Sequence, residues 1–349
     1  MSVLYVTEQG TTVHKLGRRL VVRKLGHVIE TVHTFNLEQV ILFGNIQLTA
    51  QATTFLLQEG IDTVFMGTGG RYRGRLVSGD GKNILLRRQQ FRKAEEESFL
   101  LDIAQRFVRG KLNNCRTLLR RHQRQRPNDE IQTALLRINH SIRALAGTRS
   151  LDEIRGREGA GAAAYFGCFP RLILQEGFPF GGRTRRPPKD AVNALLSFGY
   201  TMLLGTVTTA IQVVGLDPFL GSLHAAENGK PSLVLDLMEE FRPLLVDAAV
   251  LRAINRRQMV PGDFLYQEDV EMPAELAGDE PPAREDYPVL LRPESIRKWI
   301  LVYEQTLRQR VLYPPLGTQI TWRQVVLEQA RRLARHIKAE EIYEPFVPR

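Results

Sequence analysis

The sequence predicts an α+β protein, in which a small N-terminal β-rich domain at residues 1–80 precedes a larger all-helical domain at residues 83–349. Two observations carry this prediction. Short segments rich in β-branched residues, separated by glycine or polar turns, fill the first 80 residues. From Asn83 onward, apolar residues recur at helical intervals instead. The glycine-rich stretch 67–82 between these two regions is the predicted domain boundary.

The N-terminal elements follow from the same patterns, taken in order. We expect strands at residues 3–6, 12–16, 19–24, 28–35 and 40–43. Residues 49–59 have helical spacing and stop at Gly60, and residues 61–66 form another apolar segment of strand length. A small sheet domain with one embedded helix is therefore expected.

Two segments of the helical region stand out by composition. Residues 191–216 carry no formal charge and are long enough to cross a bilayer, but Asn193, Ser197 and several threonines dilute them. We expect a buried pair of core helices there and no membrane span. Residues 261–293 gather acidic residues and prolines with little periodicity, which predicts a surface insertion or loop.

Composition limits the class of protein. The 349 residues carry a net charge of +10 and a pI near 9.8, so the surface favours polyanions such as nucleic acid. Hydrophobic residues make up 43% of the chain, which is enough for a packed core. Cys115 and Cys168 are too few for a disulfide framework, and the N-terminus lacks a secretory pattern. A cytoplasmic location is expected.

Four side chains together predict a site for a hard divalent cation. His224 precedes the segment 235–245, whose apolar residues recur at helical spacing. Asp236 and Glu239 stand three residues apart in that segment, so we expect them to share a face pointing away from its apolar stripe. With Glu158, which lies in a run of small residues, this set suits Mn²⁺ or Mg²⁺ better than zinc. The local pattern also fits a solvated helix face beside an ordinary loop histidine.

Other motifs point to DNA or to plain packing. The loop 183–189 joins four cations, Arg183, Arg185, Arg186 and Lys189, to two prolines and is expected to contact phosphates. Residues 159–164 match a glycine-rich dinucleotide fingerprint, but no buried strand precedes them, so that site is rejected. These small residues permit close approach either of another helix or of DNA backbone to Glu158. The arginine-rich run 106–126 leaves open whether it forms a DNA-binding stripe or a solvated face.

Several of these motifs, in order, resemble one known family. They are Arg-Glu-Gly at 157–159 leading into Ala-Ala-Tyr-Phe, Arg-Arg-Pro-Pro-Lys-Asp-Ala-Val-Asn at 185–193, Gly-Ser-Leu-His at 221–224 and Leu-Asp-Leu-Met-Glu-Glu-Phe-Arg-Pro at 235–243. Residues 40–49 add a segment similar to the family's β-domain. Nearly the whole chain resembles the CRISPR-associated integrase, the metal-dependent endonuclease of spacer acquisition.

The resemblance implies a helical catalytic domain, a homodimer formed through the β-domains, and a complex with a small ferredoxin-like partner on double-stranded and branched DNA. By position, Glu158, His224 and Glu239 match the family's metal ligands, although some relatives have Asp where this chain has Glu239. Asp236 matches an acidic position beside them, suited to orienting His224. Nearby cations, Arg157, Lys230 and Arg242, are placed to neutralise charge on a scissile phosphate.

The expected activity is insertion of short foreign DNA into a CRISPR array by attack of a 3′-hydroxyl on a phosphodiester, with Mn²⁺ or Mg²⁺ as cofactor. Two alternatives remain open at this point. One is a non-catalytic DNA-binding scaffold that uses the basic helices alone. The other is a structure-specific nuclease that cuts branched DNA in repair without joining it.

Overall fold

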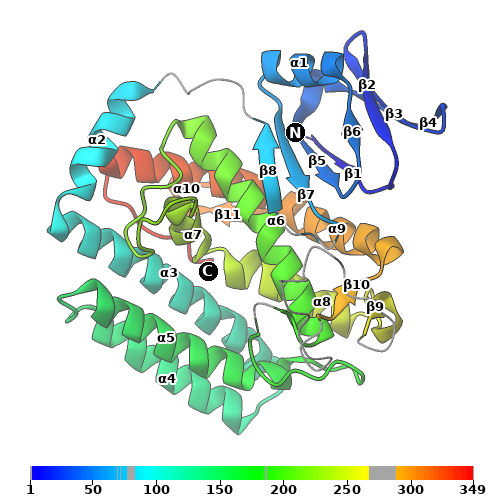
Figure 1. Cartoon of the computed structure of the whole chain (residues 1–349). Helices are drawn as coiled ribbons and strands as arrows, with labels where there is room; N and C mark the ends of the chain where they lie inside the picture. The colour runs from blue at the N-terminus through cyan, green and yellow to red at the C-terminus, as the bar shows by residue number, and fades with distance from the viewer. Residues whose placement is uncertain are drawn as a thin grey trace, which may run out of the picture. The chain divides into compact units, whose positions relative to one another are not determined.

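The computed structural model describes residues 2–68, 70, 72–76, 83–184, 187–266 and 288–348. The chain divides into two compact units. The first contains residues 1–80 and 291–297, and the second contains residues 81–290 and 298–349 (Figure 1). Residues 291–297, which the sequence analysis placed in the helical domain, thus belong to the first unit.

The first unit contains two four-stranded sheets. One has the order β1-β5-β7-β8, with β1, β5 and β7 parallel and β8 antiparallel to β7. The other has the order β4-β3-β2-β6. The strands are β1 (Ser2–Val6), β2 (Thr12–Leu16), β3 (Arg19–Lys24), β4 (His27–His33), β5 (Leu37–Phe43), β6 (Gln47–Leu48), β7 (Asp62–Met66) and β8 (Tyr72–Leu76). β6 and β8 were missed, because β6 is only two residues long and β8 lies in the stretch assigned to the domain boundary.

Apolar side chains from both sheets and from helix α1 (Ala50–Gln58) form the core of this unit. Leu4, Val13 and Leu56 are among its buried members. The side chain of Thr49 caps α1 by accepting a hydrogen bond from the backbone N–H of Ala52 at 3.3 Å. β4, by contrast, has no fully buried residue.

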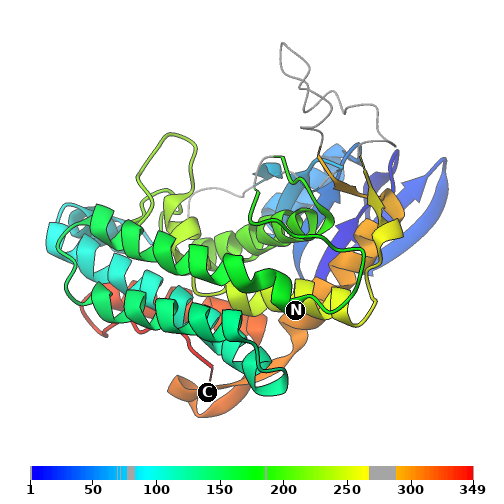
Figure 2. The same ribbon diagram turned by 90° about the horizontal axis from the view of Figure 1, so that it is seen from below.

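The second unit is built mainly of helices. They are α2 (Ile84–Ala94), α3 (Glu97–Gln125), α4 (Asp129–Leu145), α5 (Leu151–Cys168), α6 (Ala191–Val214), α7 (Ser232–Met238), α8 (Ala248–Asn255), α9 (Pro293–Arg308, from residue 298 onward) and α10 (Trp322–Ile337). α3, α4 and α5 pack side by side (Figures 1 and 2), and α6 packs against α7 and α10. The α+β fold class is therefore confirmed. Two short two-stranded sheets that were not predicted, β9 (Phe264–Leu265) with β10 (Leu290–Leu291) and β11 (Arg310–Tyr313) with β12 (Thr318–Thr321), interrupt the helices.

α6 is the uncharged segment of the sequence. It is one continuous helix and not the expected pair, with Asp190 as its N-cap and Gly215 as its left-handed C-cap. Within the described residues α6 is the one helix long and apolar enough to cross a membrane, and 67% of its most apolar stretch is buried inside the unit. Burial of this kind is what a core helix shows. Cys115 and Cys168 are free and buried, as expected.

The acidic region 261–293 lies mostly outside the described residues. Its described ends form a short 3₁₀ turn (Pro261–Asp263), the β9–β10 pair and the start of α9.

The segment 235–245 is not the single helix that was expected. α7 ends before Glu239, and a π-helical segment (Arg242–Asp247) follows it after a turn. Proline lacks an N–H and cannot complete the regular α-helical ladder, so Pro243 explains the change. The N–H of Ala248 instead reaches back five residues to the carbonyl of Pro243. As a result, Asp236 and Glu239 do not share an outward face, and both are buried.

Candidate active site

A lysine lies on the buried side of α3. This helix buries an apolar stripe that includes Ile103, Phe107 and Leu118, and Lys111 belongs to the same stripe. Its side chain is only 10% exposed. Burial disfavours the ammonium form, but the negative charges of Glu239 and Glu158 outweigh this effect and raise the pKa of Lys111. Lys111 is therefore a buried cation held by anionic partners.

Glu158 and Glu239 both bind this ammonium group. Lys111 donates a hydrogen bond to Oε1 of Glu158, which α5 presents. The Lys111 Nζ also lies 2.6 Å from Oε2 of Glu239. This contact is an ion pair without hydrogen-bond geometry. Oε1 of Glu239 lies 3.0 Å from Nε of Arg242. Burial acts to raise the pKa of Glu239. The positive charges of Arg242 and Lys111 outweigh burial and lower this pKa to about 2, so the side chain is ionised.

Asp236 organises the loop that carries His224. Its Oδ2 accepts backbone N–H groups of Ser222 at 2.5 Å and Leu223 at 3.0 Å. Its Oδ1 accepts the N–H of His224 at 2.9 Å and lies 2.7 Å from Nδ1 of the same residue. An added Cβ at Gly221 would lie 2.8 Å from Asp236 Oδ2, so only glycine lets the chain pass so close.

The contact between Asp236 and His224 sets the imidazole tautomer. A carboxylate can only accept hydrogen bonds, so Nδ1 must carry the hydrogen. The lone pair then resides on Nε2, the nitrogen available to a cation. The structure places this carboxylate against Nδ1 of the imidazole, and the orienting role of Asp236 stays a prediction.

Arg155 connects this loop to α5. Its Nε donates to the carbonyl oxygen of Leu223 at 2.9 Å, and it stands one helical turn before Glu158. Glu158 and Glu239, predicted from positions far apart in the sequence, thus meet at Lys111, and Arg155 links the His224 loop to the helix that carries Glu158; we treat these residues as one cluster.

The donor set of this cluster fits a divalent cation. Two carboxylates already converge on a single positive charge, and the imidazole of His224 lies on the loop that Arg155 joins to α5. Such oxygen and nitrogen donors suit Mn²⁺ or Mg²⁺. In the described part of the chain, however, no three His, Cys, Asp or Glu side chains are grouped closely enough to hold a metal as they stand. Lys111 lies between the two carboxylates instead.

A further buried carboxylate, Asp247, lies beside the cations of the cluster. Asp247 accepts hydrogen bonds from Tyr165 at 2.9 Å and from Tyr200 at 2.6 Å. The guanidinium carbons of Arg242 and Arg183 lie 4.7 Å and 5.3 Å from the centroid of the Tyr200 ring. Burial raises the pKa of Asp247 to about 6, although the tyrosine hydroxyls and Arg242 partly oppose that shift.

A cavity of about 470 Å³ opens beside the cluster. Lys111 and Arg183 supply its cations, and the rings of Phe166 and Phe180 supply apolar walls. Small residues of α5, among them Ala163, complete the lining. The cavity combines positive charge with aromatic surface.

The small residues of α5 divide into two groups. A Cβ at Gly161 would lie 2.4 Å from a Leu112 methyl group, so this glycine serves helix packing against α3. Gly156 and Gly159 are exposed and face open space. Gly161 therefore fits close packing of another helix, and Gly159 fits close approach of a DNA backbone.

The predicted basic residues occupy different environments. Arg242 is 19% exposed and bound to Glu239, and Arg183 donates to Asn193 Oδ1 at 2.8 Å and Ser197 Oγ at 3.1 Å. Lys230 pairs with Glu227 at 2.8 Å. Arg157 and Lys189 are exposed. Arg185 and Arg186 lie outside the described residues.

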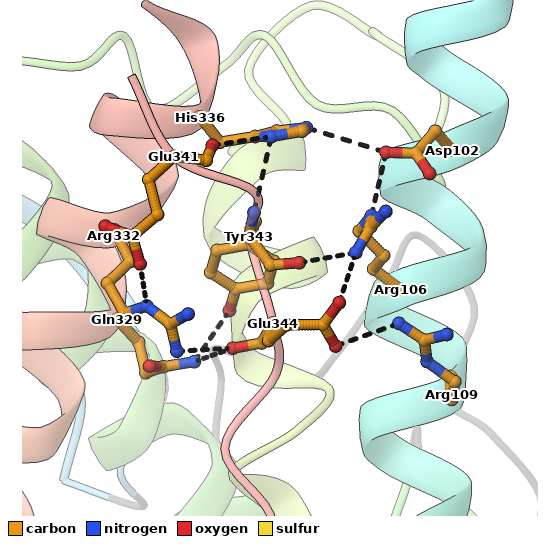
Figure 3. A network of polar contacts seen from close by, with 9 residues as sticks. All are labelled: Asp102, Arg106, Arg109, Gln329, Arg332, His336, Glu341, Tyr343 and Glu344. Carbon is orange, nitrogen blue, oxygen red and sulfur yellow. Dashed lines mark hydrogen bonds and ion pairs between the residues drawn. The ribbon is translucent and has the colours of Figure 1, made fainter. Parts of the chain in front are cut away.

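The C-terminal segment 341–348 lies between α3 and α10 (Figure 3). On the α3 side, Arg106 Nη1 donates to the Tyr343 carbonyl at 2.8 Å and to Glu344 Oε1 at 2.7 Å, and Arg109 Nη2 donates to Glu344 Oε2 at 3.1 Å. On the α10 side, Arg332 donates to the Glu344 carbonyl at 3.0 Å. The two arginines that begin the run 106–126 thus hold the tail.

This tail also contacts residues that adjoin the cluster in sequence. The Phe346 N–H donates to Glu240 Oε2 at 3.2 Å, and Asn114 Nδ2 donates to the Phe346 carbonyl at 2.9 Å and to the Glu240 carbonyl at 2.8 Å. Glu240 follows Glu239 directly, and Asn114 lies one turn after Lys111. Burial raises the pKa of Glu240 to about 8, although hydrogen bonds from Gln329, Tyr343 and the Phe346 N–H partly oppose that shift.

Comparison with known proteins identifies the family. The family model described as CRISPR associated protein Cas1 matches residues 4–276. This chain belongs to the Cas1 family. A relative named CRISPR-associated endonuclease Cas1 3, from Thermus thermophilus, is 36% identical, over 100% of this chain and 98% of the relative. A Geobacter sulfurreducens relative, named CRISPR-associated exonuclease Cas4/endonuclease Cas1 fusion, is 35% identical over 99% of this chain and 60% of its own length.

Solved structures share the Cas1 fold of this chain. A casposase bound to integration product superposes with a TM-score of 0.82 at 24% identity, covering 99% of this chain and 93% of the casposase. A Cas1 protein from Thermotoga maritima gives 0.81 at 22% identity, covering 99% and 100%. The family that the sequence motifs resembled is therefore confirmed.

Four members of the cluster escaped the sequence analysis: Lys111, Arg155, Tyr200 and Asp247. Lys111 and Asp247 fall on faces that are otherwise apolar. A charged residue within such a stripe was the available signal, since an isolated charge is seldom buried without a partner. Arg155 and Tyr200 gave no comparable signal.

Proposed function

We propose that this chain is a metal-dependent DNA integrase and endonuclease that inserts short foreign DNA fragments as new spacers into a CRISPR array. A 3′-hydroxyl of the fragment would attack a phosphodiester of the array. The observation that carries this proposal is the convergence of Glu158 and Glu239 on one positive charge. Asp236 also contacts Nδ1 of His224, which leaves Nε2 of that imidazole for a metal ion. The Cas1 membership of the chain supports it.

The proposed roles follow from these contacts. Glu158, Glu239 and Nε2 of His224 would hold Mn²⁺ or Mg²⁺, and the bound ion would supply Lewis-acid stabilisation of phosphoryl transfer. Asp236 keeps the His224 ring in the ligating tautomer. Arg242, fixed by Glu239, presents a permanent charge that can stabilise the developing negative charge on a phosphate.

DNA would approach over α5 and the basic loop. Arg157 and Lys189 are exposed, and the open faces of Gly156 and Gly159 let a backbone come close to Glu158. Lys230, Arg183, Arg185 and Arg186 are proposed as further phosphate contacts on charge and position. Because the affinity for DNA would be spread over many residues, loss of one metal ligand would abolish strand transfer and leave most DNA binding intact.

The proposed assembly is a homodimer formed through the β-rich unit. Apolar side chains around β4 are exposed, including Leu25 at 90% and Phe35 at 92%. Exposed apolar surface of this kind marks protein contacts. A small ferredoxin-like partner and double-stranded or branched DNA complete the proposal. One structural neighbour is titled a Cas6-RT-Cas1–Cas2 complex, with a TM-score of 0.81 over 99% of this chain.

A strand-transfer assay tests the proposal. Supercoiled DNA with a repeat and its leader is mixed with a short 3′-hydroxyl duplex, the small partner, Mn²⁺ and the protein. Glu239→Gln should lower joined product by more than about a hundredfold, because even residues behind metal ligands typically matter 10–100-fold. Glu227→Gln changes an exposed carboxylate in the loop that follows His224, and this variant should keep full activity.

The alternatives have their own outcomes. DNA binding without product from any protein would indicate a scaffold. Cleavage of branched DNA without joining would indicate a structure-specific nuclease.

A further inference from the structure

Lys111 occupies the place between the two carboxylates that a divalent cation would need. Its ammonium contacts Glu158 from α5 and Glu239 from the turn after α7, and it is 10% exposed. Glu239 is even less exposed, at 6%. A cation that bound both carboxylates would therefore meet Lys111 at once.

The charges around this position are balanced as they stand. Two cations, Lys111 and Arg242, meet two carboxylates, Glu158 and Glu239, at this position. A divalent ion added beside Lys111 would leave the cluster with two excess positive charges, and like charges in a poorly solvated site repel strongly. Binding of the ion therefore favours departure of the ammonium.

The structure provides a place for the departing side chain. Lys111 also lines the cavity of about 470 Å³, together with Arg183. A lysine has a long flexible stem, so its ammonium can swing from the carboxylates into this cavity. There it would stand on the side where the basic residues meet DNA.

We propose that Lys111 is a built-in competitor of the divalent cation, which bridges Glu158 and Glu239 in the metal-free protein and is displaced toward the cavity when the ion binds. This inference rests on the proposed metal site. It adds that metal binding exposes a cation for a DNA phosphate, so the metal and the DNA strengthen each other's binding.

Calorimetric titration of DNA-free protein with Mn²⁺ tests the competition. The apparent dissociation constant equals the intrinsic one divided by the fraction of molecules whose site is open. If Lys111 fills the site in more than nine molecules in ten, Lys111→Met should bind Mn²⁺ at least about tenfold more tightly. Arg183→Met removes a cation from the same cavity without freeing the two carboxylates, so its affinity should change less than about threefold.

Each other result overturns the inference. Equal or weaker binding by Lys111→Met, with binding by the unaltered protein, rejects competition and leaves the metal site standing. An equal gain in Arg183→Met shows a general charge effect only. Absence of Mn²⁺ binding in both the unaltered protein and Lys111→Met rejects the proposed metal dependence as well.

A second measurement uses the unaltered protein, in case Lys111→Met does not fold. Lysines are reductively methylated and quantified by mass spectrometry, with and without Mg²⁺. The Lys111 rate should rise at least about fivefold with Mg²⁺, because a side chain released from both carboxylates reaches solvent, can give up its proton to water and then reacts as the neutral amine. Lys93, paired with Glu96 elsewhere in the unit, should not change. An unchanged or slower rate at Lys111 under saturating Mg²⁺ contradicts displacement.

Discussion

Replacing Asp236 with asparagine should destabilise the fold and disturb His224 together. The carboxylate accepts from four donors, which are three backbone N–H groups of residues 222–224 and the imidazole Nδ1. An asparagine side chain has a single acceptor oxygen. In either orientation of the amide, two of the four donors therefore lose their acceptor.

The size of the effect follows from that loss. Hydrogen bonds to a charged acceptor contribute roughly 1.5–3 kcal/mol each, so two of them amount to about 3–6 kcal/mol. His224 is 29% exposed, and solvent can reach part of its loop. We therefore expect Asp236→Asn to lower the free energy of unfolding of the helical unit by about 3 kcal/mol. Where the amide NH₂ faces the ring, the hydrogen must move to Nε2, which removes the lone pair from the ligating position.

Urea unfolding followed by circular dichroism measures the stability change, and ¹⁵N chemical shifts of the imidazole report the tautomer. Glu227→Gln, which changes an exposed carboxylate beside the same loop, is the matched control and should shift the free energy of unfolding by less than about 0.5 kcal/mol. A loss below about 1 kcal/mol for Asp236→Asn, with the His224 tautomer and Mn²⁺ affinity unchanged, would refute the role assigned to Asp236.

Three further predictions test other parts of the cluster. The pKa of Asp247 is raised from 3.8 to about 6, so its contribution to stability is full below pH 4 and lost as the pH rises to 6. Asp247→Asn should remove this pH dependence in urea melts recorded between pH 4 and pH 7; a curve parallel to that of the unaltered protein would contradict this. Phe346→Ala should cost about 3–5 kcal/mol in the same melts, whereas Ile342→Ala on the exposed side of the tail should cost under 1 kcal/mol, and equal losses would argue against a docked tail. Gly221→Ala should lower Mn²⁺ affinity at least about tenfold in calorimetry, because its Cβ would push Asp236 away from the loop, and unchanged affinity would show that the loop adapts.

Local pattern in the sequence was sufficient for most elements. Alternating or clustered β-branched residues located β2 and β3 with the bounds that the structure shows, and Gly60 marked the end of α1 within two residues. The prediction failed where one residue altered the backbone ladder. Pro243 turned an expected straight helix into α7 and a π-helical segment, and this change decided where Asp236 and Glu239 point.

Residue chemistry and order along the chain were enough to predict the two-part architecture and the Cas1 family, whereas the ligand set Glu158, His224 and Glu239 stays a prediction. Only the folded structure decided what these side chains touch. Periodicity shows which face of a helix is buried, but it carries no information on which distant segment covers that face. The burial of Lys111 between two carboxylates, and the support of the cluster by the C-terminal tail, depend on such long-range packing of helices.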